Sequence, residues 1–390
     1  MKIIEIGTGY TSIPAKIGAA TEIVIENLLR EWGEQNVDLE LIDVSFDGVK
    51  HNKSYNYKRN EIKLHSFFCK NKDKSFFHIL KRIVYSVKLG FFIKKHLSRN
   101  QENIILHFHN QFNFVLTLLI ANKIYRKSNI KWVYTVHTPG WPFFKKIPKS
   151  LFLEKYSILK ADMVISLTKN IKSKLIDLVG KNIEDKIVVI PNGVSREIYH
   201  PLENLKKENI ILNIGSICER KNQLGSIIAL KVFLTSNNYK FVFAGKIVDI
   251  AYYEKIKEYL KENNLETKVQ YIGEVSPGEE LNLLYNKSKI YLSHSLQEAF
   301  ISLVVLESMS SGLPVLLSNS FKNFIDTNNP INKALLIVED DVMQTEIEKL
   351  LNDDGIKQEL ISKQINCIDE YFTWNQISKK SIEKFHKLYK

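Results

Sequence analysis

Residues 291–315 read YLSHSLQEAFISLVVLESMSSGLPV, and this stretch decides the fold. An alternating apolar strand at residues 290–293 gives way to a polar loop that holds Glu298. An apolar helix follows and carries Glu307, and Gly312 ends that helix before the next strand. The stretch therefore predicts a strand, loop, helix, strand unit of an α/β protein.

The ligand site of such a unit lies beyond the carboxyl ends of its strands, so we expect the loop around Glu298 to face a ligand. Backbone N–H groups at the start of the helix suit a phosphate. The residues that would offer them are Phe300, Ile301, Ser302 and Leu303. Two carboxylates beside an anion site are poor ligands for the anion but good acceptors for hydrogen bonds from sugar hydroxyls. The sequence therefore predicts a binding site for a nucleotide sugar.

The segment from Glu298 to Val315 resembles the signature of the retaining family 4 glycosyltransferases, which have the GT-B fold. Their signature usually has seven residues between its two Glu residues, whereas eight separate Glu298 from Glu307 here. The resemblance implies that Glu307 holds the ribose diol and that Glu298 lies beside the donor sugar, with a catalytic role. On the residues alone, Glu307 could also be a solvated Glu on an amphipathic helix.

The composition indicates a globular protein long enough for two domains, with 390 residues, 44% hydrophobic and 25% charged. Its three cysteines, Cys69, Cys218 and Cys367, have neither metal-type spacing nor a disulfide pattern, which favours a reducing cytosol. The N-terminal run contains Glu5 and is typical of a buried strand instead of a signal peptide. We expect a cytoplasmic protein, and a peripheral position on the inner face of the cell membrane stays open.

Positive charge is concentrated in the first half of the chain. Residues 1–200 hold 32 Lys and Arg against 18 Asp and Glu, while the rest holds 23 against 25. Between Lys50 and Lys174 there are 26 basic and 5 acidic side chains. Such asymmetry favours one domain that meets an anionic surface or substrate, although a solvated basic face without a partner stays open.

A Gly-rich loop follows the first predicted strand, at residues 7–20, where phosphate commonly meets backbone amides. The spacing of Gly7, Gly9 and Gly18 does not match the dinucleotide fingerprint. The corresponding family loop carries a Gly pair that closes over the donor diphosphate. Gly18-Ala19 stands in that place here, so the resemblance implies donor contact by Gly18.

A basic amphipathic helix is predicted at residues 77–97. Its apolar stripe would hold Phe77, Leu80, Val84, Val87 and Phe91, with lysines elsewhere. Such a helix suits an anionic membrane surface. The alternative is a domain helix that buries the stripe in the core and solvates its lysines.

Three histidines fall near strand ends. His107 and His109 share one face of the strand at residues 103–109, because strand side chains alternate. No Asp or Glu ligand is near them in the sequence, so we expect no metal site. The family resemblance places His137 near the donor sugar and the reaction centre, and it assigns the acceptor side to the segment that contains Trp141, together with His107 and His109.

The segment 216–223 follows a strand of the second domain. The family places basic residues in this loop against the donor diphosphate, where they stabilise the charge of the leaving group. Lys221 matches one of these two basic family positions. Ser216 stands at the other, and Arg220 could compensate for it. The alternative is that Arg220 and Lys221 are a solvated pair without a ligand. Strands that end at Gly245 and Gly273 would let backbone approach the nucleotide.

The predicted architecture is α/β with the GT-B fold: two Rossmann-like α/β/α domains that face each other across a cleft. The boundaries are an acceptor-binding domain at 1–193, a linker at 194–209, a donor-binding domain at 210–370, and a C-terminal helix at 371–390 that returns to the first domain. A helix is expected at residues 112–125, and loop and strand between residues 46 and 75.

The predicted function is retaining transfer of a hexose-type sugar from a UDP- or GDP-sugar to an acceptor hydroxyl, on a lipid-linked or cell-surface glycan precursor. No cofactor and no obligatory metal are expected, because protein groups would bind the donor. Three alternatives stay open: a nucleotide-sugar 2-epimerase, a basic nucleic-acid-binding protein and a catalytically silent binder of nucleotide sugars. The absence of a recognisable nucleic-acid module argues against the second.

Overall fold

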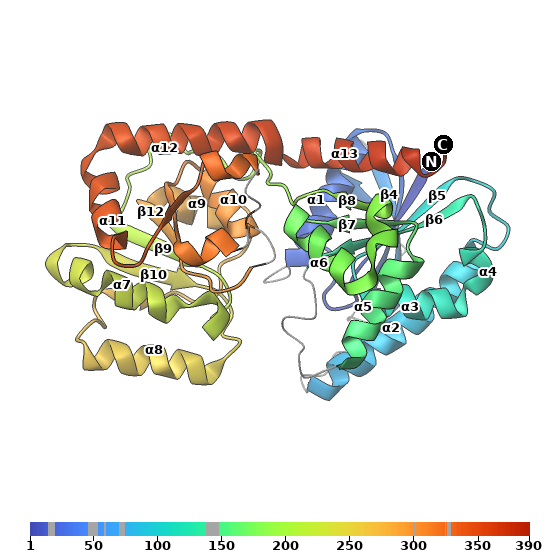
Figure 1. Ribbon diagram of the computed structural model, residues 1–390, viewed down its shortest axis with the longest axis horizontal. Coiled ribbons are helices and arrows are strands. Elements are labelled where there is room, and N and C mark those ends of the chain that lie inside the picture. Colours follow the sequence, from blue (N-terminus) through green and yellow to red (C-terminus); the bar gives the residue numbers. More distant parts are fainter. Residues whose placement is uncertain are drawn as a thin grey trace. The chain divides into compact units, whose positions relative to one another are not determined.

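The computed structural model describes the chain except residues 15–19, 46–53, 58–59, 70–74, 138–147, 299–300, 324 and 326–328. The chain folds into two compact units (Figure 1). The first consists of Met1–Ala15, Ala19–Pro191 and Trp374–Lys390, and the second mainly of Asn192–Thr373. The first unit is therefore built from both ends of the chain.

The first unit contains an eight-stranded sheet in the order β3-β4-β2-β1-β5-β6-β7-β8. All neighbouring strands pair in parallel except β3, which pairs antiparallel with β4. The strands are β1 (Lys2–Ile6), β2 (Asp38–Ser45), β3 (Ser54–Tyr57), β4 (Asn60–Phe68), β5 (Ile104–Phe108), β6 (Ile130–Val136), β7 (Met163–Ser166) and β8 (Ile187–Val189). Their helices are α1 (Ala20–Glu34), α2 (Ser75–His96), α3 (Gln111–Ile120), α4 (Asn122–Tyr125), α5 (Pro148–Lys160), α6 (Lys169–Val179), the short 3-10 helix η1 (Lys181–Lys186) and α13 (Trp374–Lys387).

The second unit contains a six-stranded sheet, parallel throughout, in the order β11-β10-β9-β12-β13-β14. The strands are β9 (Ile210–Ile214), β10 (Lys240–Ala244), β11 (Val269–Tyr271), β12 (Ile290–Ser293), β13 (Val315–Ser318) and β14 (Leu336–Val338). The helices are α7 (Gln223–Ser236), α8 (Ile250–Glu262), α9 (Glu279–Lys287), α10 (Leu303–Ser310), α11 (Met343–Asn352) and α12 (Asp354–Cys367). Four shorter helices are η2 (Glu219–Lys221), η3 (Asn319–Asn323), η4 (Pro330–Lys333) and η5 (Ile368–Phe372).

Apart from β3, both sheets are parallel, and parallel strands covered on both faces require nearly continuous apolar runs. In β1, for example, every residue after Lys2 is buried. The decisive stretch forms β12, a loop, α10 and β13, as its pattern predicts. These are two Rossmann-like sheets, each with helices interleaved between its strands.

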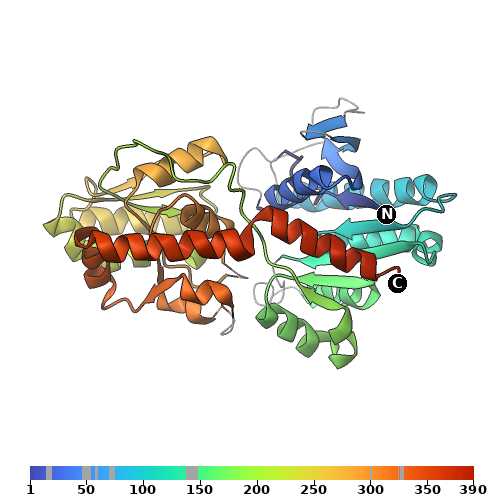
Figure 2. The same cartoon turned by 90° about the horizontal axis from the view of Figure 1, so that it is seen from above.

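Helix α13 packs on α1 within the first unit, which brings the chain termini close together (Figure 2). The buried indole of Trp32 donates a hydrogen bond of 3.0 Å to Ser381 Oγ, and its ring lies 5.9 Å from that of Phe385. The Gln35 amide donates to Ser378 Oγ at 2.6 Å. The predicted return of the C-terminal helix to the first domain is thus confirmed.

One prediction about local structure needs correction. The single helix expected at residues 112–125 is interrupted at Ala121, where α3 ends and the short α4 begins. The strand content expected between residues 46 and 75 is confirmed, because the described part of that segment contains the β3–β4 hairpin, which forms one edge of the sheet.

Helix α2 lies where the basic amphipathic helix is predicted, but it buries a different face. Leu80, Val84 and Phe91 of the predicted stripe are 45%, 38% and 59% exposed. The buried side chains on the described part of this helix include Lys81, Tyr85, Leu89 and Ile93. The alternative in which the predicted stripe packs in the core is therefore wrong for Leu80, Val84 and Phe91, because a second apolar stripe on the same helix occupies the core. Val87 is half-buried, and the side chain of Phe77 lies outside the described residues.

Candidate functional site

The loops after β9 and β12 meet at the carboxyl edge of the second sheet. The short helix η2 follows β9 and ends at Asn222, whose backbone is left-handed (φ 52°) and whose side chain caps α7. The backbone N–H of Leu296 donates to the Arg220 carbonyl oxygen at 2.9 Å, which ties the two loops together. The basic residues and Glu298 are therefore held side by side.

Glu298 is the centre of this cluster. One carboxylate oxygen pairs with Lys221 Nζ and accepts from Ser295 Oγ at 2.8 Å. The other lies 3.3 Å from Arg220 Nη1. The structure thus brings together three residues predicted separately for the donor site. Cationic side chains held in such a cluster suit a diphosphate.

Glu307 lies on α10, where it is 5% exposed and accepts a hydrogen bond of 3.1 Å from Tyr285 Oη. Burial raises the pKa of Glu307 to about 7, although hydrogen bonds from Tyr285 and Tyr199 counteract the rise. The alternative of a solvated Glu on an amphipathic helix is therefore wrong. Sequence reasoning missed both tyrosines, because they come from α9 and from the segment that precedes β9.

The N-terminus of α10 carries the predicted phosphate-binding amides. Ile301 is 1% exposed, and the helix begins at Leu303 with Ser302 as its N-cap. The Ser302 side chain makes no capping hydrogen bond, and its carbonyl oxygen accepts from the Val305 amide at 3.0 Å, so the amides at the very start of the helix are the ones that could meet a phosphate. Phe300 lies outside the described residues, as do Gly18 and Trp141 of the predicted donor and acceptor sites.

Gly245 follows β10 with φ 140°, a conformation that favours glycine. A Cβ atom at Gly245 would lie 2.1 Å from the carbonyl oxygen of Gly215, so this glycine permits close packing of two backbone segments. Gly273, with φ 84°, has open space where its Cβ would stand. Of these two strand-end glycines, Gly273 is therefore the one with room for a ligand beside it.

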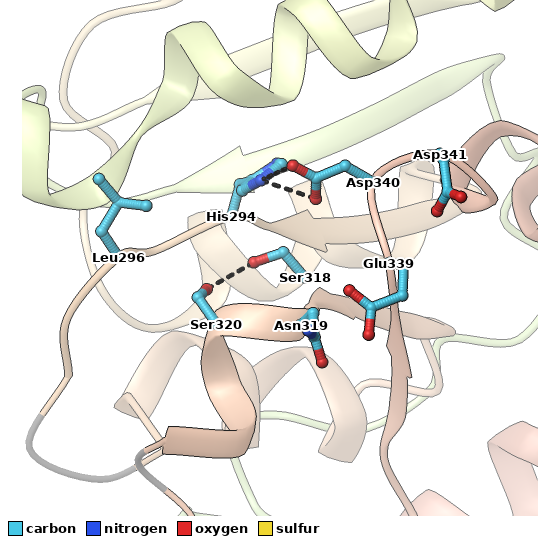
Figure 3. Close-up of a pocket in the computed structure, with 8 residues that line it drawn as sticks. All are labelled: His294, Leu296, Ser318, Asn319, Ser320, Glu339, Asp340 and Asp341. Carbon is cyan, nitrogen blue, oxygen red and sulfur yellow. Dashed lines mark hydrogen bonds and ion pairs between the residues drawn. The ribbon is translucent and has the colours of Figure 1, made fainter.

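A pocket of about 540 Å³ lies at the carboxyl ends of β12, β13 and β14 (Figure 3). Its lining residues are His294, Leu296, Ser318, Asn319, Ser320, Glu339, Asp340 and Asp341. His294 Nε2 lies 3.0 Å from Asp340 Oδ1, and burial lowers the pKa of His294. Three carboxylates make this pocket unsuitable for a diphosphate, which supports the Glu298 side of the sheet edge as the donor site.

A row of polar side chains follows the carboxyl edge of the first sheet. His107 of β5 lies directly opposite Glu5 of β1, and its Nδ1 is 2.9 Å from Glu5 Oε2. His107 Nε2 is 2.7 Å from Thr135 Oγ1. His109 Nε2 contacts the other Glu5 oxygen, and His109 Nδ1 lies 2.7 Å from His137 Nε2. All of these residues come from strands or directly follow them.

Glu5 determines the proton positions in this row. Burial alone would raise the pKa of Glu5, but His107 and His109 outweigh it through charge and hydrogen bonding and lower the pKa to about 2. The ionised carboxylate only accepts, so His109 donates from Nε2. Burial lowers the pKa of His109 and that of His137. A neutral His109 must then accept at Nδ1, so His137 donates from Nε2 and keeps the Nδ1 lone pair available.

No Asp or Glu ligand is near these histidines in the sequence, but Glu5 lies between His107 and His109 in space, so the ground for expecting no metal site is wrong. A second group of this kind is formed by Glu40, His65 and His96, whose ring nitrogens lie 3.0 Å and 2.9 Å from Glu40 Oε2. The ligand atoms in each group are close enough to hold a metal ion. The only sequence signal was a charged residue within each buried strand.

Among the described residues, no helix combines the length and the apolar character needed to cross a membrane. The model for glycosyltransferase family 4 matches residues 21–198, and the model for glycosyl transferases group 1 matches residues 195–366. An uncharacterized glycosyltransferase of Methanocaldococcus jannaschii is 25% identical over 301 residues, which cover 77% of this chain and 75% of the relative.

Solved structures show the same fold along the entire chain. Sucrose-phosphate synthase from Thermosynechococcus elongatus matches with a TM-score of 0.79 and 17% identity, over 100% of this chain and 99% of its own. HepE of Anabaena, solved in complex with UDP and glucose, matches with a TM-score of 0.71 and 14% identity, over 99% of each chain. With the two family models on adjoining halves, these findings show that the chain belongs to the group 1, family 4 glycosyltransferases and has the two-domain GT-B fold.

Proposed function

We propose that this glycosyltransferase moves a hexose-type sugar, with retention, from a nucleoside diphosphate sugar to a hydroxyl of a lipid-linked or cell-surface glycan precursor. The observation that carries the donor assignment is the cluster of Glu298, Lys221 and Arg220 at the carboxyl edge of the second sheet. The complex of HepE with UDP supports a uridine nucleotide as the first candidate. The comparisons do not favour the epimerase or the nucleic-acid-binding alternative.

In the proposed reaction, the bond between the anomeric carbon and the diphosphate oxygen breaks, and the acceptor oxygen bonds to the same face of that carbon. The acceptor proton passes to an oxygen of the departing diphosphate. Lys221 and Arg220 stabilise the negative charge that develops on the diphosphate, as do the amides at the start of α10. Glu307 anchors the ribose, and Glu298 positions the donor sugar.

His137 is proposed to lie near the reacting sugar, with His107 and His109 behind it. The row from Glu5 to His137 fixes which nitrogen of His137 bears the proton, so His137 Nδ1 is an acceptor for a sugar hydroxyl. Because the donor is held by protein cations and amides, we expect activity without a divalent metal.

The first unit is proposed to bind the cytoplasmic face of an anionic membrane through α2. Four apolar side chains of this helix, Leu80, Ile83, Val84 and Phe91, are 38–59% exposed. Lys88, Lys94 and Lys95 are exposed on the same helix. An exposed apolar stripe with neighbouring lysines is complementary to anionic lipids. Failure to sediment with anionic vesicles at low salt would contradict this part of the proposal alone.

Thermal unfolding with UDP, GDP, ADP and their sugar derivatives, with and without EDTA, tests the donor site. A ligand that binds the folded state raises the melting temperature, by an amount that grows with its concentration over Kd. We expect one nucleotide series to stabilise the wild type and to lose most of that effect in Lys221→Ala. Lys255→Ala is the matched control, because Lys255 is exposed on α8. No stabilisation by any nucleotide would contradict the proposed function.

A further inference from the structure

Arg82 of α2 has an unusual environment. Its guanidinium carbon lies 4.1 Å from the ring centroid of Tyr10 and 4.5 Å from that of Phe112. Tyr10 belongs to the loop after β1, and Phe112 belongs to the first turn of α3, which follows β5. Arg82 therefore lies at the carboxyl edge of the first sheet, the edge that also holds the row from Glu5 to His137.

This guanidinium has no counter-charge in the described part of the chain. No carboxylate there forms an ion pair with Arg82, and its Nε is buried without a hydrogen-bond partner. Burial lowers the pKa of the guanidinium, while Tyr10 and Tyr134 counteract the fall. Charged groups removed from water are normally paired, because an unpaired charge loses its hydration without compensation, which destabilises the folded state. An anion that binds here would supply the missing partner.

The aromatic contacts prepare Arg82 for such a ligand. Stacking on two rings restricts the planar guanidinium, which then presents its N–H groups in a fixed direction. Lys81, the preceding residue, reaches the same loop and donates from Nζ to the Tyr10 carbonyl oxygen at 2.9 Å. Two adjacent cations favour a group that can carry two negative charges, which is a phosphate instead of a carboxylate.

The residues that follow Arg82 indicate where the phosphate comes from. Ile83 and Val84 are 39% and 38% exposed, and they belong to the apolar stripe of α2. A lipid tail in contact with this stripe would bring its head group to the level of Arg82. Within the proposed function, on which this step rests, we infer that Arg82, stacked on Tyr10 and Phe112, binds the phosphate of a lipid-phosphate acceptor.

Binding of dodecyl phosphate in dodecyl maltoside micelles, measured by isothermal titration calorimetry, tests this assignment. We expect Arg82→Met to bind about 10- to 100-fold more weakly than the wild type, since a hydrogen bond to a charged group contributes roughly that factor. Arg82→Lys, which keeps the charge but loses the planar fork, should fall between them. Arg126→Met, which removes an exposed Arg before β6 at the opposite edge of the sheet, should match the wild type.

Inorganic phosphate distinguishes a lipid phosphate from a free one. Equal, Arg82-dependent binding of inorganic phosphate would overturn the lipid assignment, and dodecyl phosphate binding that Arg82→Met leaves unchanged would overturn the site. The melting temperature of Arg82→Met should stay close to that of the wild type, because the Met side chain can still pack on the rings of Tyr10 and Phe112 and the charge that is removed has no ion-pair partner among the described residues. A melting temperature that falls clearly in Arg82→Met would contradict this reasoning, and Arg82→Lys then tests the site. If nucleotides fail to stabilise the wild type while Arg82-dependent binding persists, the donor assignment fails and the phosphate site stands.

Discussion

Replacing Glu5 by Gln should destabilise the first unit at neutral pH. The lowering of the Glu5 pKa from 4.5 to about 2 corresponds to about 3 kcal/mol, because one pKa unit is worth about 1.4 kcal/mol. The hydrogen bonds from His107 and His109 indicate a contribution to stability of the same order of magnitude, since a hydrogen bond to a charged group contributes roughly 1.5–3 kcal/mol. A Gln side chain has a single acceptor oxygen, so one imidazole N–H would face an amide donor.

Urea unfolding followed by tryptophan fluorescence measures this change, because Trp32, Trp132 and Trp374 belong to the first unit. We expect the free energy of unfolding of Glu5→Gln to be about 3 kcal/mol lower at pH 7. Glu102→Gln is the matched control, since the Glu102 side chain is 63% exposed, and it should change stability by less than about 0.5 kcal/mol.

The pH dependence has a definite sign. The pKa of Glu5 is lower in the folded state, so its stabilisation is complete above pH 4.5 and is lost as the pH falls towards 2. The difference between wild type and Glu5→Gln should therefore still be present at pH 5 and should shrink by about 1.4 kcal/mol for each pH unit below 4.5. Equal stability of the two proteins at pH 7, or a difference that persists undiminished below pH 4.5, would refute the reasoning.

Four further predictions concern the second unit and catalysis. Glu307→Gln should become more stable than the wild type as the pH rises from 4.5 to 7, by up to about 3 kcal/mol, because the raised pKa of Glu307 in the folded state makes the wild type lose stability over that range. Denaturation at several pH values measures this difference. Glu307→Ala should raise the donor KM about 10- to 100-fold. Gly245→Ala should lower the melting temperature far more than Gly273→Ala, whose cost should be about 1 kcal/mol, because only the first would place a Cβ against backbone; equal effects would contradict the packing argument. Removal of divalent ions with EDTA should leave the transfer rate unchanged, and a rate that returns only with added metal would contradict donor binding by protein groups alone.

The sequence predicted best what local patterns determine. Apolar runs and the helix end at Gly312 identified β12, α10 and β13, and the family resemblance of the motif around Glu298 led to the basic loop that contacts it. The pairing of Glu298 with Lys221 and Arg220 was not predicted, because the family roles assign each residue to a ligand and not to one another.

Long-range contacts account for what the sequence did not predict. Glu5 and His109 are about a hundred positions apart, and only the order of the strands in the sheet makes them neighbours. In α2, two apolar stripes overlap in the sequence, and packing against α3 decides which one is buried. Nothing in the sequence singled out Arg82. An Arg in a basic region becomes notable only when the structure shows that no carboxylate among the described residues pairs with it.

The position of α13 has a consequence for biosynthesis. Trp32 and Gln35 find their hydrogen-bond partners in Ser381 and Ser378, 349 and 343 positions later in the chain, so the first unit cannot be completed until that distant segment has been synthesised. The second unit has all of its strands in one continuous stretch that ends at Thr373, and it can fold beforehand. The N-terminal domain, although translated first, would thus be the last to reach its final structure, and a nascent chain cut short within the last helix should leave the Trp32 face of α1 uncovered.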